Sequence, residues 1–156
     1  MMNIKRETIL PPPSAKRVKE FESFHRVKLP MEFIDFINSS NGGRPNKLVI
    51  EADSEDRLIE QFLCLLDDPR NEAVHGQYEI SVVIAQIEDR LTDDEEQIGT
   101  TLIPFAAIFG GDFLCMDFRQ QKDDPSIVLW DHNESDELEP VTYSVADSMG
   151  AFLSML

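Results

Sequence analysis

TLIPFAAIFGGDFLCMDF, residues 101–118, contains two apolar runs that are separated only by Gly110 and Gly111. Two strand-like runs joined by a glycine pair predict an antiparallel hairpin, because tight two-residue turns need positive φ. Pro104 has no backbone N–H, so we expect the first of these strands to lie at a sheet edge or to begin late. The run SIVLWDH (126–132) predicts a further strand after the hairpin.

Upstream of the hairpin, residues 80–91 predict a helix, because their apolar residues recur at i, i+3, i+4, i+7 and i+11. Two earlier aliphatic runs, KLVIE (47–51) and LIEQFLCLL (58–66), predict strands, although the second also fits a short helix. Residues 67–78 have no such pattern and are expected to form a loop.

Both ends of the chain predict helices. After the triple proline, Ser14 is the expected N-cap of a first helix, and the Leu29–Pro30 pair separates it from a second, which ends at Asn41–Gly43. Near the C-terminus, Ser144 and Asp147 resemble a capping box that leads into a helix ending at Leu156. The order of elements predicts one α+β domain over residues 1–156, with 1–13 extended and a mainly antiparallel sheet flanked by helices.

The charge is strongly negative and unevenly distributed. The chain of 156 residues has a formal net charge of −16. Three windows (51–68, 88–96 and 123–139) carry −18 between them, opposed only by Arg57 and Arg90, while the rest sums to +2. This balance argues against binding nucleic acid or anionic membranes and fits a basic protein partner, although acidic loops also occur simply for solubility.

The N-terminus has no apolar segment typical of a secretory leader and no run long enough to span a bilayer, so we expect a cytoplasmic protein. Cys64 and Cys115 both lie in apolar runs and are expected to be buried, reduced thiols. His25 and His75 stand in unrelated contexts and are expected to be solvated or hydrogen-bonded.

One group of residues resembles a catalytic or metal site: Asp112, Asp117, Asp131 and His132, near the ends of the predicted C-terminal strands. Asp117 lies five residues after Asp112, which places the two on opposite faces of a strand, and no metal-binding motif supports the group. We therefore interpret these residues as structural, and predict no catalytic residue, cofactor or metal; a small hydrolase remains a third hypothesis.

Four blocks resemble the SUKH superfamily. They are FESFHRVKLPMEFIDFINSSNGGRP (21–45), LIPFAAIFGGDFLCMDF (102–118), IVLWDHNE (127–134) and VADSMGAFLSML (145–156), and they occur in the order typical of the family. The chain departs from the family pattern at Ile108 and Phe109, where an acidic or polar residue is common. The resemblance implies an α+β domain without catalytic residues. It also implies that the matched residues are structural; these are Leu29, Pro30, Asn41, Gly42, Gly43, Gly110, Gly111 and Trp130.

Bacterial members of the superfamily are mostly immunity proteins encoded beside toxins, often nucleases. The resemblance and the charge together lead to the hypothesis of a non-enzymatic inhibitor whose acidic loops cover the cationic surface of a toxin. The alternative is an intracellular scaffold or regulatory module that involves no toxin. The predicted partner-binding residues are Asp53, Glu55, Asp56, Asp93, Asp94, Glu95, Glu96, Asp123, Asp124, Glu134, Asp136 and Glu137.

Overall fold

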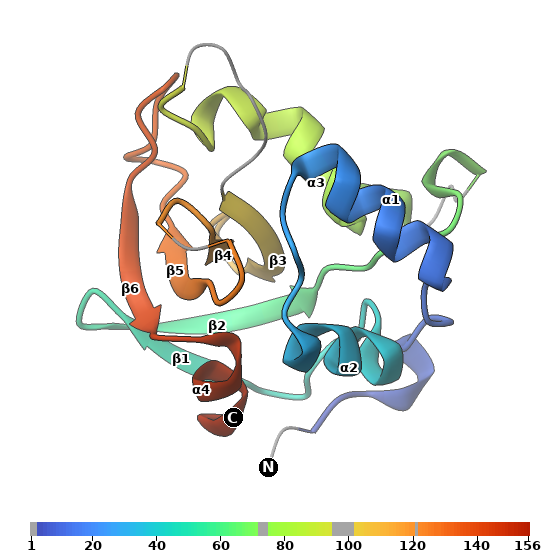
Figure 1. The fold of residues 1–156 in the computed structure, drawn as a ribbon. Helices are drawn as coiled ribbons and strands as arrows, with labels where there is room; N and C mark the ends of the chain where they lie inside the picture. The colour runs from blue at the N-terminus through green and yellow to red at the C-terminus, as the bar shows by residue number, and fades with distance from the viewer. Residues whose placement is uncertain (1–2, 72–74, 95–101, 121) are drawn as a thin grey trace.

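The computed structural model describes residues 3–71, 75–94, 102–120 and 122–156. It confirms a single α+β domain with one six-stranded antiparallel sheet in sequential order (Figure 1). The strands are β1 (Val49–Ala52), β2 (Glu55–Phe62), β3 (Leu102–Ile108), β4 (Phe113–Asp117), β5 (Ser126–Trp130) and β6 (Thr142–Ala146). The helices are α1 (Ala15–His25), α2 (Met31–Ser40), α3 (Ile80–Ile87) and α4 (Met149–Ser154), with 3-10 turns η1 (Arg6–Thr8), η2 (Pro69–Asn71), η3 (Gly76–Tyr78) and η4 (Glu88–Arg90).

The predicted hairpin is confirmed, with β3 paired to β4 across Gly110 and Gly111 at φ values of 106° and 112°. The expectation that Pro104 confines β3 to an edge or a late start is wrong, because β3 lies between β2 and β4 from Leu102 onward. The sheet tolerates the proline for two reasons. The register to β4 shifts directly after it, and the pairing of β2 with β3 extends only to Ala106.

The core lies where α2 and α4 meet the central strands. Phe105 of β3 contacts the rings of Phe33 and Phe152 edge-on, at centroid distances of 6.1 and 5.5 Å. All seven residues of β3 are buried, so this strand is covered on both faces. Among the described residues, no helix is both long and apolar enough to cross a membrane.

The end of α2 is tied to the segment after β2 through the side chain of Asn41, which is 1% exposed. Its carbonyl oxygen accepts from the Leu65 amide at 2.9 Å, and its amide donates to the Leu65 carbonyl at 3.0 Å and to that of Pro11 at 2.8 Å. Gly42 follows at a φ of 69°, which favours glycine. The Asn41 side chain therefore pairs with both the backbone N–H and the backbone C=O of Leu65, as a neighbouring strand would do within a sheet.

The prediction for the C-terminus is wrong in detail. Residues 142–146 form β6, which the sequence pattern did not indicate, and Ser144 lies inside this strand. The helix begins only at Met149, where the Ser148 hydroxyl accepts from the Ala151 amide at 3.0 Å. The run 58–66 forms a strand rather than a helix only as far as Phe62, and this strand begins earlier than expected, at Glu55.

Both cysteines are buried and neither is in a disulfide, as expected. Burial raises the pKa of the Cys115 thiol far above its ordinary value, with the charge of Asp117 adding to the effect. His25 is 5% exposed and packs against Phe21 and Phe24, so it is not a solvated histidine. His75 is half-buried at the start of η3.

Candidate functional site

Two acidic loops from distant parts of the sequence meet beside β6. β1 contacts β6, and the charge of Asp53 in the β1–β2 turn acts on Tyr143 of β6. Tyr143 of β6 donates a hydrogen bond to the Glu134 carboxylate, at 2.8 and 2.9 Å to its two oxygens. This hydrogen bond raises the pKa of Tyr143 to about 12, with smaller contributions from the charges of Asp53 and Asp131. One phenol therefore lies within the field of carboxylates from both loops.

A second connection between these loops runs through Asp112. Its Oδ2 lies 2.8 Å from Nη1 of Arg57, whose Nη2 lies 3.2 Å from Glu55 in the β1–β2 hairpin. Its Oδ1 lies 2.5 Å from Nδ1 of His132 and accepts from the His132 amide at 3.0 Å. The start of β4 thus joins the β1–β2 hairpin to the β5–β6 loop.

The η4 turn is attached to the same loop. The Leu138 amide donates to the Asp89 carbonyl at 2.7 Å, and the Arg90 guanidinium donates to the carbonyls of His132 and Ser135. Arg90 also lies over the ring of Trp130, 5.0 Å from its centroid, and its carbonyl accepts from the indole N–H at 2.9 Å. These contacts turn the Arg90 side chain inward and hold η4 against the β5–β6 loop.

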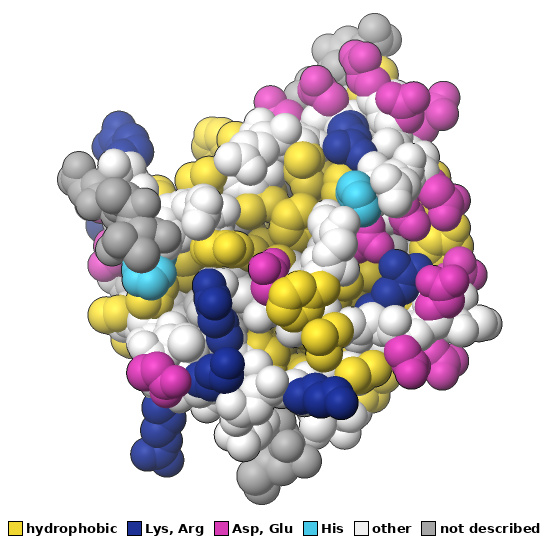
Figure 2. Space-filling model, turned by 180° about the vertical axis from the view of Figure 1, so that it is seen from behind, with side chains coloured by type: hydrophobic (Ala, Val, Ile, Leu, Met, Phe, Trp, Pro, Cys, Tyr) yellow, Lys and Arg dark blue, Asp and Glu magenta, His cyan; other side chains and the backbone are white. Residues whose placement is uncertain are grey.

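We call the combined surface the acidic edge. On the face shown in Figure 2, Asp and Glu side chains gather along one border of the molecule. Both arginines of the acidic windows are engaged there, Arg57 with carboxylates and Arg90 with carbonyls and an indole. The acidic edge therefore keeps a net negative charge, with Arg57 offsetting part of the charge of Glu55. Its residues are Asp53, Glu55, Asp56, Asp131, Glu134, Asp136 and Glu137.

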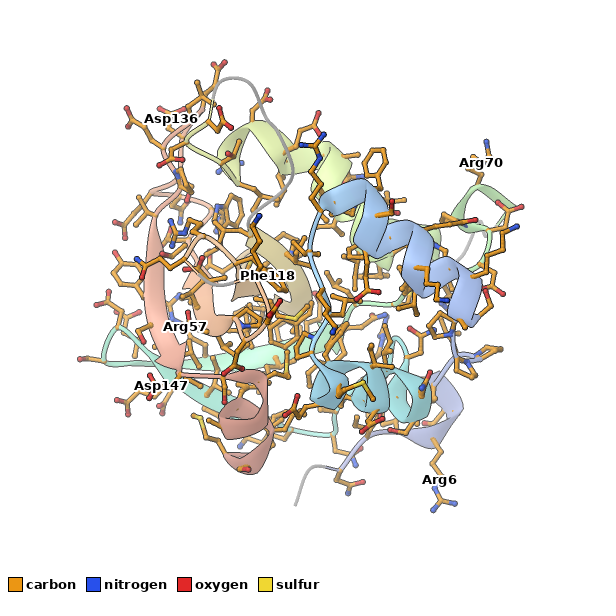
Figure 3. The ribbon with its side chains drawn as sticks, viewed as in Figure 1. Arg6, Arg57, Arg70, Phe118, Asp136 and Asp147 are labelled. Atoms are coloured by element: carbon orange, nitrogen blue, oxygen red, sulfur yellow. The ribbon has the colours of Figure 1, made fainter. Side chains whose placement is uncertain are left out.

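The remaining predicted acids lie elsewhere or are not described. Asp124 in the β4–β5 loop, next to Asp123, lines a hollow of about 410 Å³ together with Asp117 and Asp147. Figure 3 shows Asp136 and Asp147 toward opposite ends of β6. Asp93 acts on Arg119, whose pKa is raised by its hydrogen bond to Asp117 and further by the charge of Asp93.

Asp124 thus lies with Asp147 beyond the end of β6, whereas Asp93 acts on an arginine that donates to Thr142 at the start of β6. Asp94 follows Asp93, and its amide donates to the Thr92 hydroxyl at 3.0 Å. Glu95 and Glu96 lie outside the described residues. Sequence reasoning did not identify Tyr143, Asp89 or the roles of Arg57 and Arg90. Nothing in their local sequence distinguishes them, since their partners are distant along the chain.

The structure brings Asp112, Asp131 and His132 together, with candidate ligand atoms all within 4.8 Å of one another. Both oxygens of Asp112 are already engaged by Arg57 and His132. One oxygen of Asp131 accepts from the amides of Asn133 and Glu134, at 2.8 and 2.9 Å, and so organises the turn after β5. These contacts support the structural interpretation, because the cation beside Asp112 disfavours a metal ion there.

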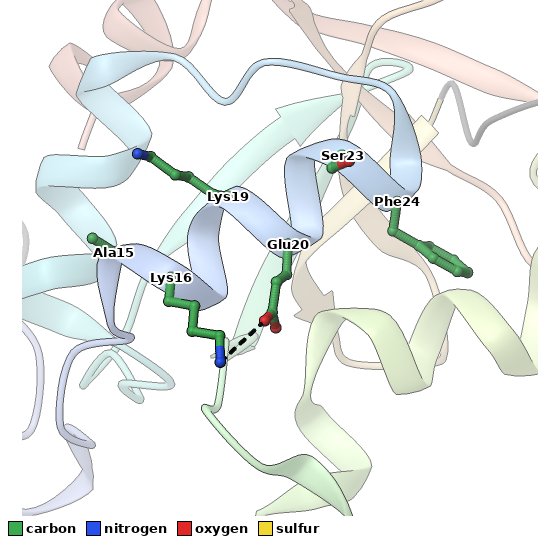
Figure 4. A pocket seen from close by; sticks show the side chains of 6 residues that line it. All are labelled: Ala15, Lys16, Lys19, Glu20, Ser23 and Phe24. Atoms are coloured by element: carbon green, nitrogen blue, oxygen red, sulfur yellow. Dashed lines mark ion pairs between the residues drawn. The ribbon is translucent and has the colours of Figure 1, made fainter.

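A broad, shallow hollow of about 670 Å³ lies over the exposed face of α1 (Figure 4). Lys16, Lys19 and the 79% exposed ring of Phe24 line it. Lys16 forms an exposed pair with Glu20 at 3.8 Å. This surface offers no converging polar groups that would suggest a small-molecule site.

Fold and site together define a small α+β domain that presents a charged edge built from loops. The model of the SMI1/KNR4 family (SUKH-1) matches residues 12–155, and the chain belongs to this family. The family commonly comprises immunity proteins of polymorphic toxin systems, which are generally non-enzymatic. A comparison with curated proteins and another with solved structures found no match.

Proposed function

We propose that this protein is a non-enzymatic, immunity-type inhibitor that binds a basic toxin through the acidic edge. The observation that supports this most directly is the hydrogen bond between Tyr143 and Glu134, in the combined field of Asp53 and Asp131. The contacts of Asp112 with Arg57 and His132 join the two segments, which are separated by about half of the sequence, and the charge of Asp53 reaches Tyr143. A surface organised in this way is suited to a partner, whereas unrelated solubilising charges need no common location.

Nuclease toxins are the favoured class of partner. A nuclease binds phosphates through Lys and Arg side chains, and carboxylates at similar spacing occupy the same groups. Arg57 pairs with Glu55 and Asp112, and Arg90 contacts carbonyl groups, so among the edge carboxylates Arg57 offsets Glu55. Association is therefore steered by long-range attraction and weakened by added salt.

The test is titration calorimetry against the product of the neighbouring toxin gene, at low and at raised salt. The edge variant combines Asp53→Asn, Asp136→Asn and Glu137→Gln, which keep side-chain size. Asn at position 53 also tolerates the observed φ of 52°. The matched control combines Glu20→Gln, Glu32→Gln and Asp35→Asn, which remove the same charge from exposed positions on α1 and α2.

We expect the edge variant to weaken binding about tenfold or more and to reduce its salt dependence, with the control within about twofold of the parent protein. Equal losses in both variants would show that only net charge matters, and would refute the acidic edge as the binding surface. Binding to a cellular enzyme instead of the toxin would favour the scaffold or regulatory alternative.

A further inference from the structure

An exposed apolar row crosses the outer face of β1, β2 and the end of β3. Val49 is paired with Leu58, and the Phe109 amide donates to the Leu58 carbonyl at 3.1 Å, so the three residues lie side by side. Their exposed fractions are 45%, 37% and 57%. Contiguous exposed apolar side chains of this kind mark an interaction surface more often than isolated ones do.

Opposite charges flank the two sides of this row. Two residues along β1 from Val49, Glu51 is paired directly with Asp56, and both are exposed. Lys47 lies two residues before Val49. It lines a hollow of about 410 Å³ together with Lys5, Arg44 and the apolar Leu58 and Phe109. Figure 2 shows this face, with hydrophobic side chains across its middle, basic side chains toward the lower left and below, and acidic ones at the right.

The acidic side of the row lacks compensation within the sheet. Like charges directly opposite each other on neighbouring antiparallel strands are destabilising, and Glu51 and Asp56 form such a pair. The basic side contains one carboxylate, Glu60, among its three cations, so it keeps an excess of positive charge. One side of the apolar row is therefore negatively charged and the other side is positively charged.

We propose that this face binds a second copy of the same chain, through a two-fold axis that runs along the Val49–Leu58–Phe109 row. Rotation about such an axis places each apolar residue against its own counterpart. It also places the Glu51 and Asp56 side of one copy against the Lys47 side of the other. A surface that complements itself in this way is the requirement for a closed symmetric dimer.

A basic partner fits this face less well than a second copy does, because Lys5, Arg44 and Lys47 would repel it. The net charge of −16 opposes self-association at long range. At physiological ionic strength the screening length is about 8 Å, so this repulsion is reduced while contacts within the interface persist. The dimer does not require the proposed inhibitor function, although its acidic side shares Asp56 with the acidic edge.

The experiment is analytical ultracentrifugation of the full chain at physiological salt, from micromolar to near-millimolar concentration. The parent protein should move from the mass of one chain toward twice that mass. Phe109→Ser should weaken this association at least about tenfold. Phe24→Ser is the matched control, because Phe24 is a more exposed aromatic residue on α1, and it should leave association unchanged.

Charge reversal tests the axis itself. Lys47→Glu and Glu51→Lys should each weaken association, because each places like charges in contact across the axis. The double variant should restore it, since the complementary pair is then formed with exchanged signs. A single-chain mass at every concentration, equal losses in the Phe109 and Phe24 variants, or no restoration in the double variant would each overturn the proposal.

Discussion

Arg57 and Asp112 form an ion pair with 2.8 Å between Nη1 and Oδ2, in which the two side chains are only 18% and 8% exposed. This pair joins β2 to the start of β4, 55 residues further along the chain. It also determines where His132 lies, because the other oxygen of Asp112 contacts the imidazole. The Nε of Arg57 is buried without a hydrogen-bond partner among the described residues, so the guanidinium depends on its two carboxylates.

Removal of one member of this pair should strongly destabilise the fold. We expect Asp112→Ala to lower the free energy of unfolding by about 3 kcal/mol, because it leaves a largely buried guanidinium without its main partner. Glu20→Ala, which removes the exposed pair with Lys16, should cost less than about 0.5 kcal/mol. Urea unfolding followed by Trp130 fluorescence measures both, and similar losses in the two variants would contradict the assignment.

A second buried ion pair fastens α1 to α3. Glu79 is completely buried, lies 2.9 Å from Arg17, and accepts from the amide and the hydroxyl of Ser81 as the N-cap of α3. We expect Glu79→Ala to cost about 3 kcal/mol or more, since both the cap and the partner of Arg17 are lost. Glu79→Gln keeps an acceptor for the cap and should cost less. Chemical denaturation gives the comparison, and equal stability of the two variants would argue against a capping role.

The parts of the fold that were predictable from sequence depend on local patterns. Gly110 and Gly111 indicate a tight turn because few other residues adopt their positive φ, and the helical spacing over 80–91 is visible without any tertiary information. β6 was missed because Ser144 and Asp147 imitate a cap. Only the pairing of residues 142–146 with β5 makes them a strand. The true cap, Ser148, stands four residues later.

The acidic residues of the candidate site could be listed from sequence, but their arrangement could not. Asp53 comes near Tyr143 only because the sheet curves until β1 lies beside β6. Likewise, the sequence shows Arg57 and Asp112 as separate charges, and their pairing depends on the register between β2 and β3 and on the hairpin that follows. Contacts between such distant residues have no local signal in a single sequence.

The two glycines of the hairpin should differ in their tolerance of a side chain. A Cβ at Gly110 meets nothing within 4 Å, whereas one at Gly111 lies 3.2 Å from the His132 ring. Both substitutions strain a positive φ, so we expect Gly110→Ala to cost about 1 kcal/mol and Gly111→Ala about 1 kcal/mol more. In a His132→Ala background the difference should vanish. Thermal and urea unfolding of the two glycine variants, each with and without His132→Ala, measure the coupling between Gly111 and His132. If Gly111→Ala still costs more than Gly110→Ala without the ring, the contact with the His132 ring is not the cause of the difference.

Burial of His25 should make stability depend on pH. Loss of solvation, followed by the charge of Arg17, lowers the pKa of His25 from 6.5 to about 4. Between these values the unfolded chain binds a proton that the folded chain excludes, so His25 reduces stability as the pH falls below 6.5 and has no such effect above about 7.

His25→Leu removes this dependence. Relative to the parent protein, the variant should gain about 1–2 kcal/mol in free energy of unfolding between pH 7 and pH 5. The difference between the two proteins should stay constant between pH 7 and pH 8, where the imidazole is neutral in both states; this interval serves as the internal control. Urea titrations at the three pH values provide the measurement. Parallel pH profiles for parent and variant down to pH 5 would mean that the folded protein admits the proton, and that His25 is more accessible than its 5% exposure indicates.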